Sequence, residues 1–127
     1  MLVGGWISIF KVIMYAKENG EVPVKDFILS LDIKMQTKIM GTISVLQEYG
    51  HQLREPYSKH LEDGIFEIRT KVGSNNNRIL YFFYYGGKII LTHGFVKKTQ
   101  RTPRNEINKA RRYRKDYIER MKNDGEV

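Results

Sequence analysis

The chain has 127 residues, of which 41% are hydrophobic and 12% aromatic, and this length predicts one domain that buries its own core. It contains no cysteine, which excludes disulfide frameworks, thiolate zinc sites and cysteine nucleophiles and is compatible with the cytoplasm. Its 22 Lys and Arg residues outnumber 14 Asp and Glu residues, giving a net charge of +8. This balance favours an anionic partner: nucleic acid, an acidic protein or an anionic membrane.

Metal and membrane chemistry find little support in the sequence. The three histidines, His51, His60 and His93, lack metal-ligand spacing, and no glycine-rich phosphate-binding motif occurs, so we expect neither a metal nor a cofactor. No stretch reaches the roughly 18 apolar residues of a membrane span. The apolar N-terminal run contains Lys11 and shows no signal-peptide pattern. We therefore expect a soluble cytoplasmic protein in which residues 1–9 extend the first strand or form a short N-terminal extension.

The first half of the chain predicts one strand and two helices. Residues 10–15 are β-branched and aromatic, which is typical of a strand. Apolar residues then recur at helical spacing over 22–31 and 33–49, and we expect these two helices to pair as a hairpin. Asp32 is placed to cap the second helix and Gly50 to end it. The polar residues that follow, up to Gly64, include Pro56 and indicate a loop or irregular link.

The second half predicts a small sheet and a basic helix. Strand-like runs cover 65–72, 78–85 and 88–96, and turn residues separate them, which favours an antiparallel meander. After Pro103 the chain becomes helical and basic over 104–122. The order β-α-α-β-β-β-α predicts an α+β fold in a single domain over 1–127. In it an antiparallel sheet packs against the helical hairpin and the C-terminal helix.

Most of the net charge lies at the C-terminal end. From Lys97 onward there are eleven basic and five acidic residues. A solvated helix face explains such a run equally well, and a membrane-binding face is a weaker interpretation because the apolar stripe is thin. Phosphate binding is favoured by the segment 97–101, which combines cations with hydroxyl and amide donors. We therefore expect Arg101 and Arg104 to contact an anionic polymer.

A second concentration of charge lies inside the predicted sheet. Alternation over 65–72 places Glu67 and Arg69 on one strand face. The meander brings Arg78, together with Lys97 or Lys98, to the same face if the strand register allows it. Convergent cations stabilise the charge that develops on a phosphate during RNA cleavage by the ribose 2′-OH.

That reaction also needs a base and an acid. Glu67 is the candidate base, Lys59, His60 and His93 are candidates for the remaining steps, and the ring of Tyr81 could stack on a nucleobase. A plainer interpretation stays open for each of them. In it Glu67 only balances a neighbouring arginine, His60 bonds to backbone, and His93 and Tyr81 pack inside the sheet.

Four segments carry a resemblance to a known family. The chain resembles the HigB-type, phage-derived branch of the RelE-like toxins in residues 20–27, 59–69, 78–81 and 93–103. The match runs in order from about residue 10 to 117. The resemblance implies a RelE-like fold and a metal-independent endoribonuclease from a type II toxin–antitoxin pair. Such toxins cleave mRNA, usually on translating ribosomes, and a HigA-like helix-turn-helix antitoxin neutralises them.

The resemblance also implies roles for individual residues. Arg78 matches the arginine that contacts the scissile phosphate. Glu67 and Arg69 occupy strand positions where RelE has two lysines, so the acid–base scheme of RelE does not transfer, and its C-terminal tyrosine has no secure counterpart here. The last catalytic cation of the family falls in a segment with three basic residues, Lys97, Lys98 and Arg101.

Two groups of site residues are therefore expected. The catalytic group is Glu67, Arg69, Arg78, Lys97, Lys98 and His60, and the RNA-binding group is Lys59, Arg101, Arg104 and Tyr81. Two other classes stay open: a non-catalytic RNA- or ribosome-binding module, and a protein-interaction subunit with a basic docking face.

Overall fold

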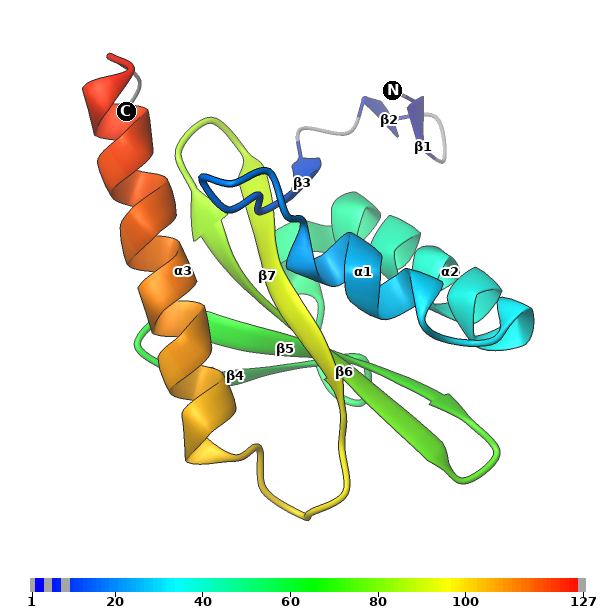
Figure 1. Ribbon diagram of the computed structural model, residues 1–127. Coiled ribbons are helices and arrows are strands. Elements are labelled where there is room, and N and C mark those ends of the chain that lie inside the picture. The colour runs from blue at the N-terminus through cyan, green and yellow to red at the C-terminus, as the bar shows by residue number, and fades with distance from the viewer. Residues whose placement is uncertain (1, 4–5, 8–9, 126–127) are drawn as a thin grey trace.

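The computed structural model describes residues 2–3, 6–7 and 10–125 (Figure 1). Its elements, in chain order, are β1 (Leu2–Val3), β2 (Trp6–Ile7), β3 (Lys11–Met14), α1 (Pro23–Leu29), α2 (Ile33–Tyr49), a 3₁₀ turn η1 (Gly50–Gln52), β4 (Ser58–Glu62), β5 (Ile65–Val72), β6 (Asn75–Tyr84), β7 (Lys88–Val96) and α3 (Arg104–Asn123). β1 and β2 pair as a short antiparallel ribbon. The expected N-terminal extension covers these two strands, and its residues 1, 4–5 and 8–9 lie outside the described residues.

The main sheet has five strands in the order β3-β7-β6-β5-β4. The predicted meander is confirmed, because β5, β6 and β7 pair in sequence as antiparallel neighbours. The prediction of an antiparallel sheet is confirmed for the meander but does not extend to β3, which pairs with β7 in parallel. The reason is the helical hairpin, which carries the chain across one face before the meander begins and leaves β3 running in the same direction as β7 (Figure 1).

The helices follow the predicted periodicity closely. In α2 the expected apolar stripe, Met35, Ile39, Ile43 and Leu46, is buried throughout. The carboxylate of Asp32 accepts a hydrogen bond of 2.8 Å from the Met35 N–H, so the predicted cap is confirmed. α1 is shorter than predicted and ends at Leu29.

The two faces of the sheet carry separate cores. One core packs α1 and α2 against one face and includes Ile68 and Ile79. On the opposite face, α3 packs against Ile65, Leu80 and Phe95 through Ala110, and Figure 1 shows α3 on the side of the sheet away from the hairpin. The predicted alternation in β5 is therefore confirmed: Ile65 and Ile68 lie in different cores.

Two segments differ from their predicted structure. Residues 58–62, expected within a loop, form the edge strand β4. Its outward side chains are exposed, so it lacks the apolar alternation that marks a half-buried strand. Residues 75–77, expected within a turn, open β6, and the hairpin turn is confined to Gly73 and Ser74.

The α+β class is confirmed by a five-stranded sheet with three helices. The RelE-like arrangement and the single domain over 1–127 stay predictions. Among the described helices, none is both long and apolar enough to cross a bilayer.

Candidate phosphate-binding site

The centre of the candidate site is Glu67, a carboxylate that is only 1% exposed on β5. Its Oε2 atom lies 3.0 Å from Nε of Arg69 and 3.3 Å from Nε of Arg78. Its Oε1 atom accepts a hydrogen bond of 2.5 Å from the hydroxyl of Thr102. Both carboxylate oxygens are therefore engaged, and Glu67 holds two guanidinium groups in place.

Strand register explains why these two arginines meet. Arg69 follows Glu67 by two residues and so shares its face, and Arg69 and Arg78 are direct cross-strand partners. Two like charges directly opposite each other repel, and the shared carboxylate offsets that repulsion. Burial lowers the pKa of Arg78; Glu67 opposes the effect and Arg69 adds to it.

Lys97 is the third cation of the cluster. It directly follows β7, and its backbone N–H bonds to the carbonyl of Asn76 on β6. Burial lowers its pKa, and the positive charges of Arg78, Arg69 and Lys59 lower it further, against the single opposing effect of Glu67. Several cations therefore crowd one carboxylate, and an added anion would relieve their mutual repulsion.

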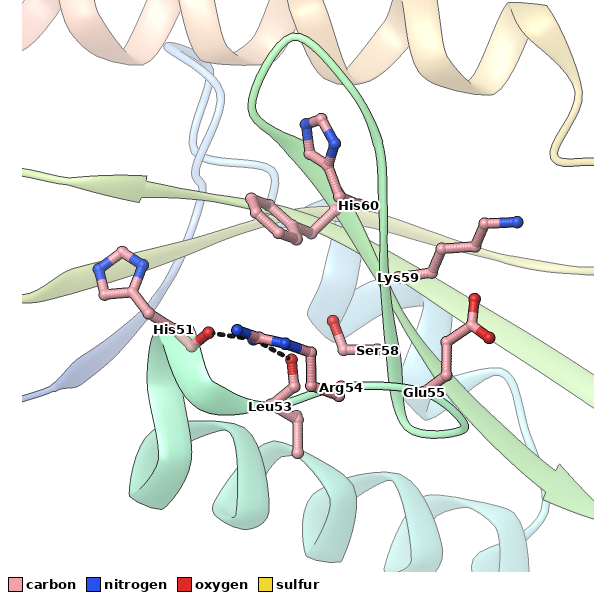
Figure 2. A pocket seen from close by; sticks show the side chains of 8 residues that line it. His51, Leu53, Arg54, Glu55, Ser58, Lys59 and His60 are labelled. Carbon is pink, nitrogen blue, oxygen red and sulfur yellow. Dashed lines mark hydrogen bonds between the residues drawn. The ribbon is translucent and has the colours of Figure 1, made fainter.

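Glu67, Arg69 and Lys97 line an open cleft of about 340 Å³ between β4, β5 and the segment that leads into α3. Arg78, which is 9% exposed, contacts Glu67 but does not line the cleft. The lining residues are Lys59, His60, Leu61, Glu62, Glu67, Arg69, Lys97, Gln100, Arg101, Thr102, Arg104 and Ile107. Five of them are lysine or arginine and two are glutamate. Lys59 and His60 also line a second pocket of about 360 Å³, beside η1 and the segment before β4 (Figure 2).

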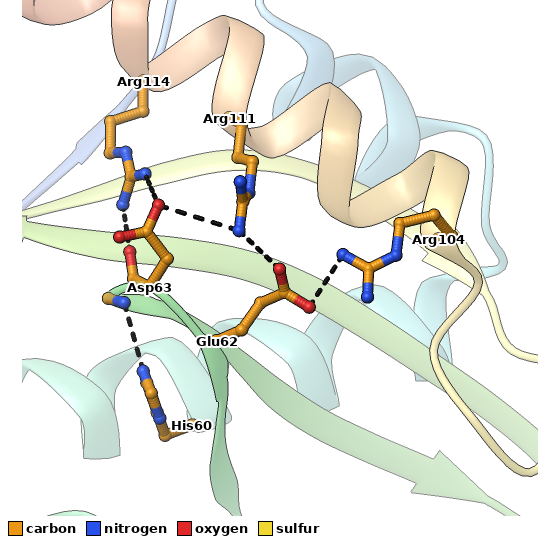
Figure 3. Close-up of polar contacts among 7 residues, drawn as sticks. His60, Glu62, Asp63, Arg104, Arg111 and Arg114 are labelled. Carbon is orange, nitrogen blue, oxygen red and sulfur yellow. Dashed lines mark hydrogen bonds and ion pairs between the residues drawn. The ribbon is translucent and has the colours of Figure 1, made fainter.

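Three arginines of α3 form ion pairs with the acids at the end of β4 and in the turn that follows it, as Figure 3 shows. Arg104 lies 2.7 Å from Glu62, and Arg111 also pairs with Glu62. Arg114 lies 2.8 Å from Asp63, at the turn between β4 and β5. Nearby arginines lower the pKa of both carboxyl groups, with Arg104 acting most on Glu62 and Arg114 most on Asp63. Several basic residues of α3 therefore hold this helix against the sheet through ion pairs.

The structure brings some of the predicted site residues together and separates others. Glu67, Arg69, Arg78 and Lys97 form the cluster, and Lys59, Arg101 and Arg104 line the cleft beside it. Lys98 is exposed and does not line the cleft, although it is the next residue after Lys97.

Of the aromatic and histidine side chains that the sequence proposed for the site, two are buried and one is exposed at the cleft. Tyr81 is 1% exposed within the hairpin-side core, and its hydroxyl bonds to that of Ser58, so its ring is not accessible to a nucleobase. His93 is also buried, bonded to Thr92 and Glu106, and burial lowers its pKa to about 3. His60 is exposed at the cleft.

Sequence reasoning missed the polar lining that comes from loops. Thr102 donates to Glu67 but follows no strand or helix period, whereas Gln100, which lines the cleft, belongs to the predicted phosphate-binding segment 97–101. The only signal for Thr102 is its position between a basic run and the proline that precedes α3. Within the described residues no group of three or more histidine, aspartate or glutamate side chains is arranged to hold a metal ion.

The fold and the site define a class: a small α+β protein with a cluster of cations around a buried carboxylate at the wall of an open cleft. Residues 26–115 match the model of the family described as phage-derived protein Gp49-like (DUF891). The chain belongs to this phage-derived, toxin-like family. No curated protein is similar enough to add to that assignment.

Proposed function

We propose that this protein is the toxin of a type II toxin–antitoxin pair and that it cleaves mRNA without a metal ion, on translating ribosomes. The observation that carries the proposal is the cluster of Arg69, Arg78 and Lys97 around one carboxylate, Glu67. Glu67, Arg69 and Lys97 line the cleft, and Arg78 pairs with Glu67 beside it. Membership of the toxin-like Gp49 family supports it.

The cluster suits the charge that develops during the proposed reaction. The ribose 2′-oxygen attacks the adjacent phosphorus, the bond to the 5′-oxygen breaks, and the products are a 2′,3′-cyclic phosphate and a 5′-hydroxyl. Negative charge grows on the non-bridging oxygens, and fixed guanidinium groups bind such oxygens in pairs. Arg69 and Arg78 are already oriented by Glu67, so little reorganisation is needed when a phosphate arrives.

Proton transfer is assigned to His60 rather than to Glu67. Both oxygens of Glu67 are used by cationic or hydroxyl partners, which leaves it poorly placed to accept a proton from a substrate. His60 is exposed at the cleft, and its Nε2 atom accepts a hydrogen bond of 3.1 Å from the Gly64 N–H. We therefore give His60 the proton-transfer role and Glu67 a positioning role.

The test is cleavage of mRNA by the chain expressed without any antitoxin. Wild type should arrest growth and create new 5′-hydroxyl ends, and purified protein should do so on translating ribosomes. Arg78→Ala and Lys97→Ala should lower the cleavage rate by about 10²- to 10³-fold, as the loss of a charge-stabilising donor does. The matched control is Lys98→Ala, which removes the same charge one residue away from the cleft.

Three results would decide against the proposal. If wild type creates no new RNA ends, the protein is not a nuclease, and tight salt-sensitive RNA binding alone would make it a binding module. Equal activity of wild type and Arg78→Ala would remove the cluster from the reaction. Equal losses in Lys97→Ala and Lys98→Ala would show a general dependence on charge rather than this cleft.

We also propose a helix-turn-helix antitoxin as the protein partner. The proposal rests on the resemblance of four segments of this chain, 20–27, 59–69, 78–81 and 93–103, to HigB-type toxins. Co-expression with a helix-turn-helix protein encoded beside this gene should restore growth, and the two proteins should purify together. Growth arrest that persists beside such a protein would separate this chain from that class of toxin–antitoxin pair.

A further inference from the structure

The second pocket, shown in Figure 2, lies next to the phosphate cleft. It has a volume of about 360 Å³ and is lined by His51, Leu53, Arg54, Glu55, Ser58, Lys59, His60 and Phe66. This size suits a small organic group. Two of its residues, Lys59 and His60, also line the cleft that holds the cation cluster. The two hollows therefore meet around β4, the edge strand of the sheet, with Phe66 on the hairpin-side face of β5 and Glu67 on the opposite face.

One wall of this pocket is aromatic. The half-buried ring of Phe66 stacks on the buried ring of Tyr81, with 5.3 Å between centroids and 20° between planes. It also packs against Phe83, and His60 lies 4.8 Å away at a tilt. Because its contacts fix the Phe66 ring, a flat group can stack on it with little loss of side-chain freedom.

The opposite wall carries polar groups that are held at defined positions. Nη1 of Arg54 donates hydrogen bonds to the carbonyls of His51, at 2.6 Å, and Leu53. These bonds orient the guanidinium across the pocket, and Figure 2 shows Arg54 between His51 and Glu55. Arg54 supplies donors, Glu55 supplies acceptors, and both side chains are exposed.

We infer that this pocket binds a nucleobase of the RNA next to the phosphate held in the cation cluster. A nucleobase is flat, presents both donors and acceptors, and is attached to a phosphate that must lie close by. Phe66 offers the stacking surface, Arg54 and Glu55 read the base edge, and Lys59 neutralises the backbone where it crosses β4. The inference rests on the proposed function, because it assumes that the anion in the cleft belongs to RNA.

The test uses short fluorescein-labelled RNAs that carry 2′-O-methyl riboses, so that binding is measured by anisotropy without any cleavage. A single abasic residue is moved through the sequence. For wild type, one position should weaken binding by about 5- to 50-fold, the size expected for the loss of one stacked base. In Phe66→Leu the effect of that position should disappear, while affinity for the abasic RNA stays as in wild type.

Phe66 also packs on the core, so a loss of binding in Phe66→Leu can result from misfolding. A second variant, outside the core, tests the pocket independently. Arg54→Gln changes an exposed side chain, and it should alter the preference among the four bases at that position. Its matched control is Arg112→Gln, which removes the same charge from an exposed position on α3 outside both pockets. A wild-type scan without a sensitive position, or equal effects of Arg54→Gln and Arg112→Gln, would overturn the inference.

Failure of the base pocket and failure of the nuclease proposal give different results. A flat abasic scan together with cleavage that depends on Arg78 removes the pocket and leaves the nuclease. A position-dependent scan without any cleavage of unmodified mRNA leaves the pocket as part of an RNA-binding module.

Discussion

Glu67→Gln is the most informative single change, because it removes the one acid of the cation cluster and hardly alters its shape. The carboxylate is 1% exposed, and the side chains of Arg69 and Arg78 beside it are 25% and 10% exposed. Breaking a buried ion pair costs about 3–5 kcal/mol, since it leaves an uncompensated buried charge. The glutamine oxygen still accepts from one neighbour, and the arginines reach solvent in part. We therefore expect a loss of roughly 2–3 kcal/mol in the free energy of unfolding.

The assay is urea and thermal unfolding of wild type and Glu67→Gln. For a chain of this length the expected loss lowers Tm by roughly 10 °C. The matched control is Glu62→Gln, which removes a carboxylate that is 31% exposed and pairs with arginines that are more exposed still. A pair of that kind contributes at most about 1 kcal/mol.

Sulfate distinguishes a positioning carboxylate from an ordinary structural one. Without Glu67, the cations of the cluster have no acid to balance them, so a divalent anion should bind them more tightly than in wild type. At constant ionic strength, sulfate should therefore raise the Tm of Glu67→Gln more than that of wild type or Glu62→Gln. Equal stabilisation of all three proteins, or a Glu67→Gln variant as stable as wild type, would refute the reasoning.

Three further outcomes are expected. Gly94→Ala should destabilise the protein by about 1–3 kcal/mol in urea unfolding, because a Cβ there overlaps the ring of Phe27; a smaller cost would mean that the ring shifts freely. The pKa of His93 falls from 6.5 to about 3, so wild type should lose stability as pH drops through this range, by roughly 5 kcal/mol, and His93→Gln should lose less; parallel pH profiles would contradict this. The phenol of Tyr15 bonds to Asp116 at 2.6 Å and its pKa rises to about 12, so Tyr15→Phe should cost about 1 kcal/mol at pH 7 and should lack the loss of stability that wild type shows between pH 10 and 12.

The helices could be predicted from sequence because their information is local. The stripe of α2 repeats at helical spacing, and Asp32 and Gly50 mark its ends. The three central strands followed from alternation and turn residues in the same way. Strand β4 escaped prediction because it is an edge strand with exposed side chains, and it carries Lys59 and His60 into both pockets.

The site needed information that a sequence pattern does not hold. Alternation placed Glu67 and Arg69 on one face, but the meeting with Arg78 depends on the register between β5 and β6. A slip of one residue would turn Arg78 toward the other face. Lys97 and Lys98 are adjacent residues of the same type, so the sequence does not distinguish them. The path of the chain after β7 places Lys97 in the cleft and leaves Lys98 exposed outside it.

The basic residues of this protein form two groups: arginines of α3 that pair with acids, and cations of the sheet that surround Glu67. Their positions along the sequence do not reveal these two groups. Most of the net charge lies after β7, yet the α3 arginines that clamp the β4–β5 turn face acids at close range, as Arg114 does with Asp63. Such paired and exposed charges attract an anion weakly. Arg69 and Arg78 share one carboxylate, and Lys97 lies near enough to both arginines and to Glu67 for their charges to act on it. Arg78 is the most deeply buried of these cations, with a side chain that is 10% exposed, and burial strengthens its attraction for an anion. The cluster holds three cations around one carboxylate, so we expect a phosphate to bind at the sheet rather than on the helix.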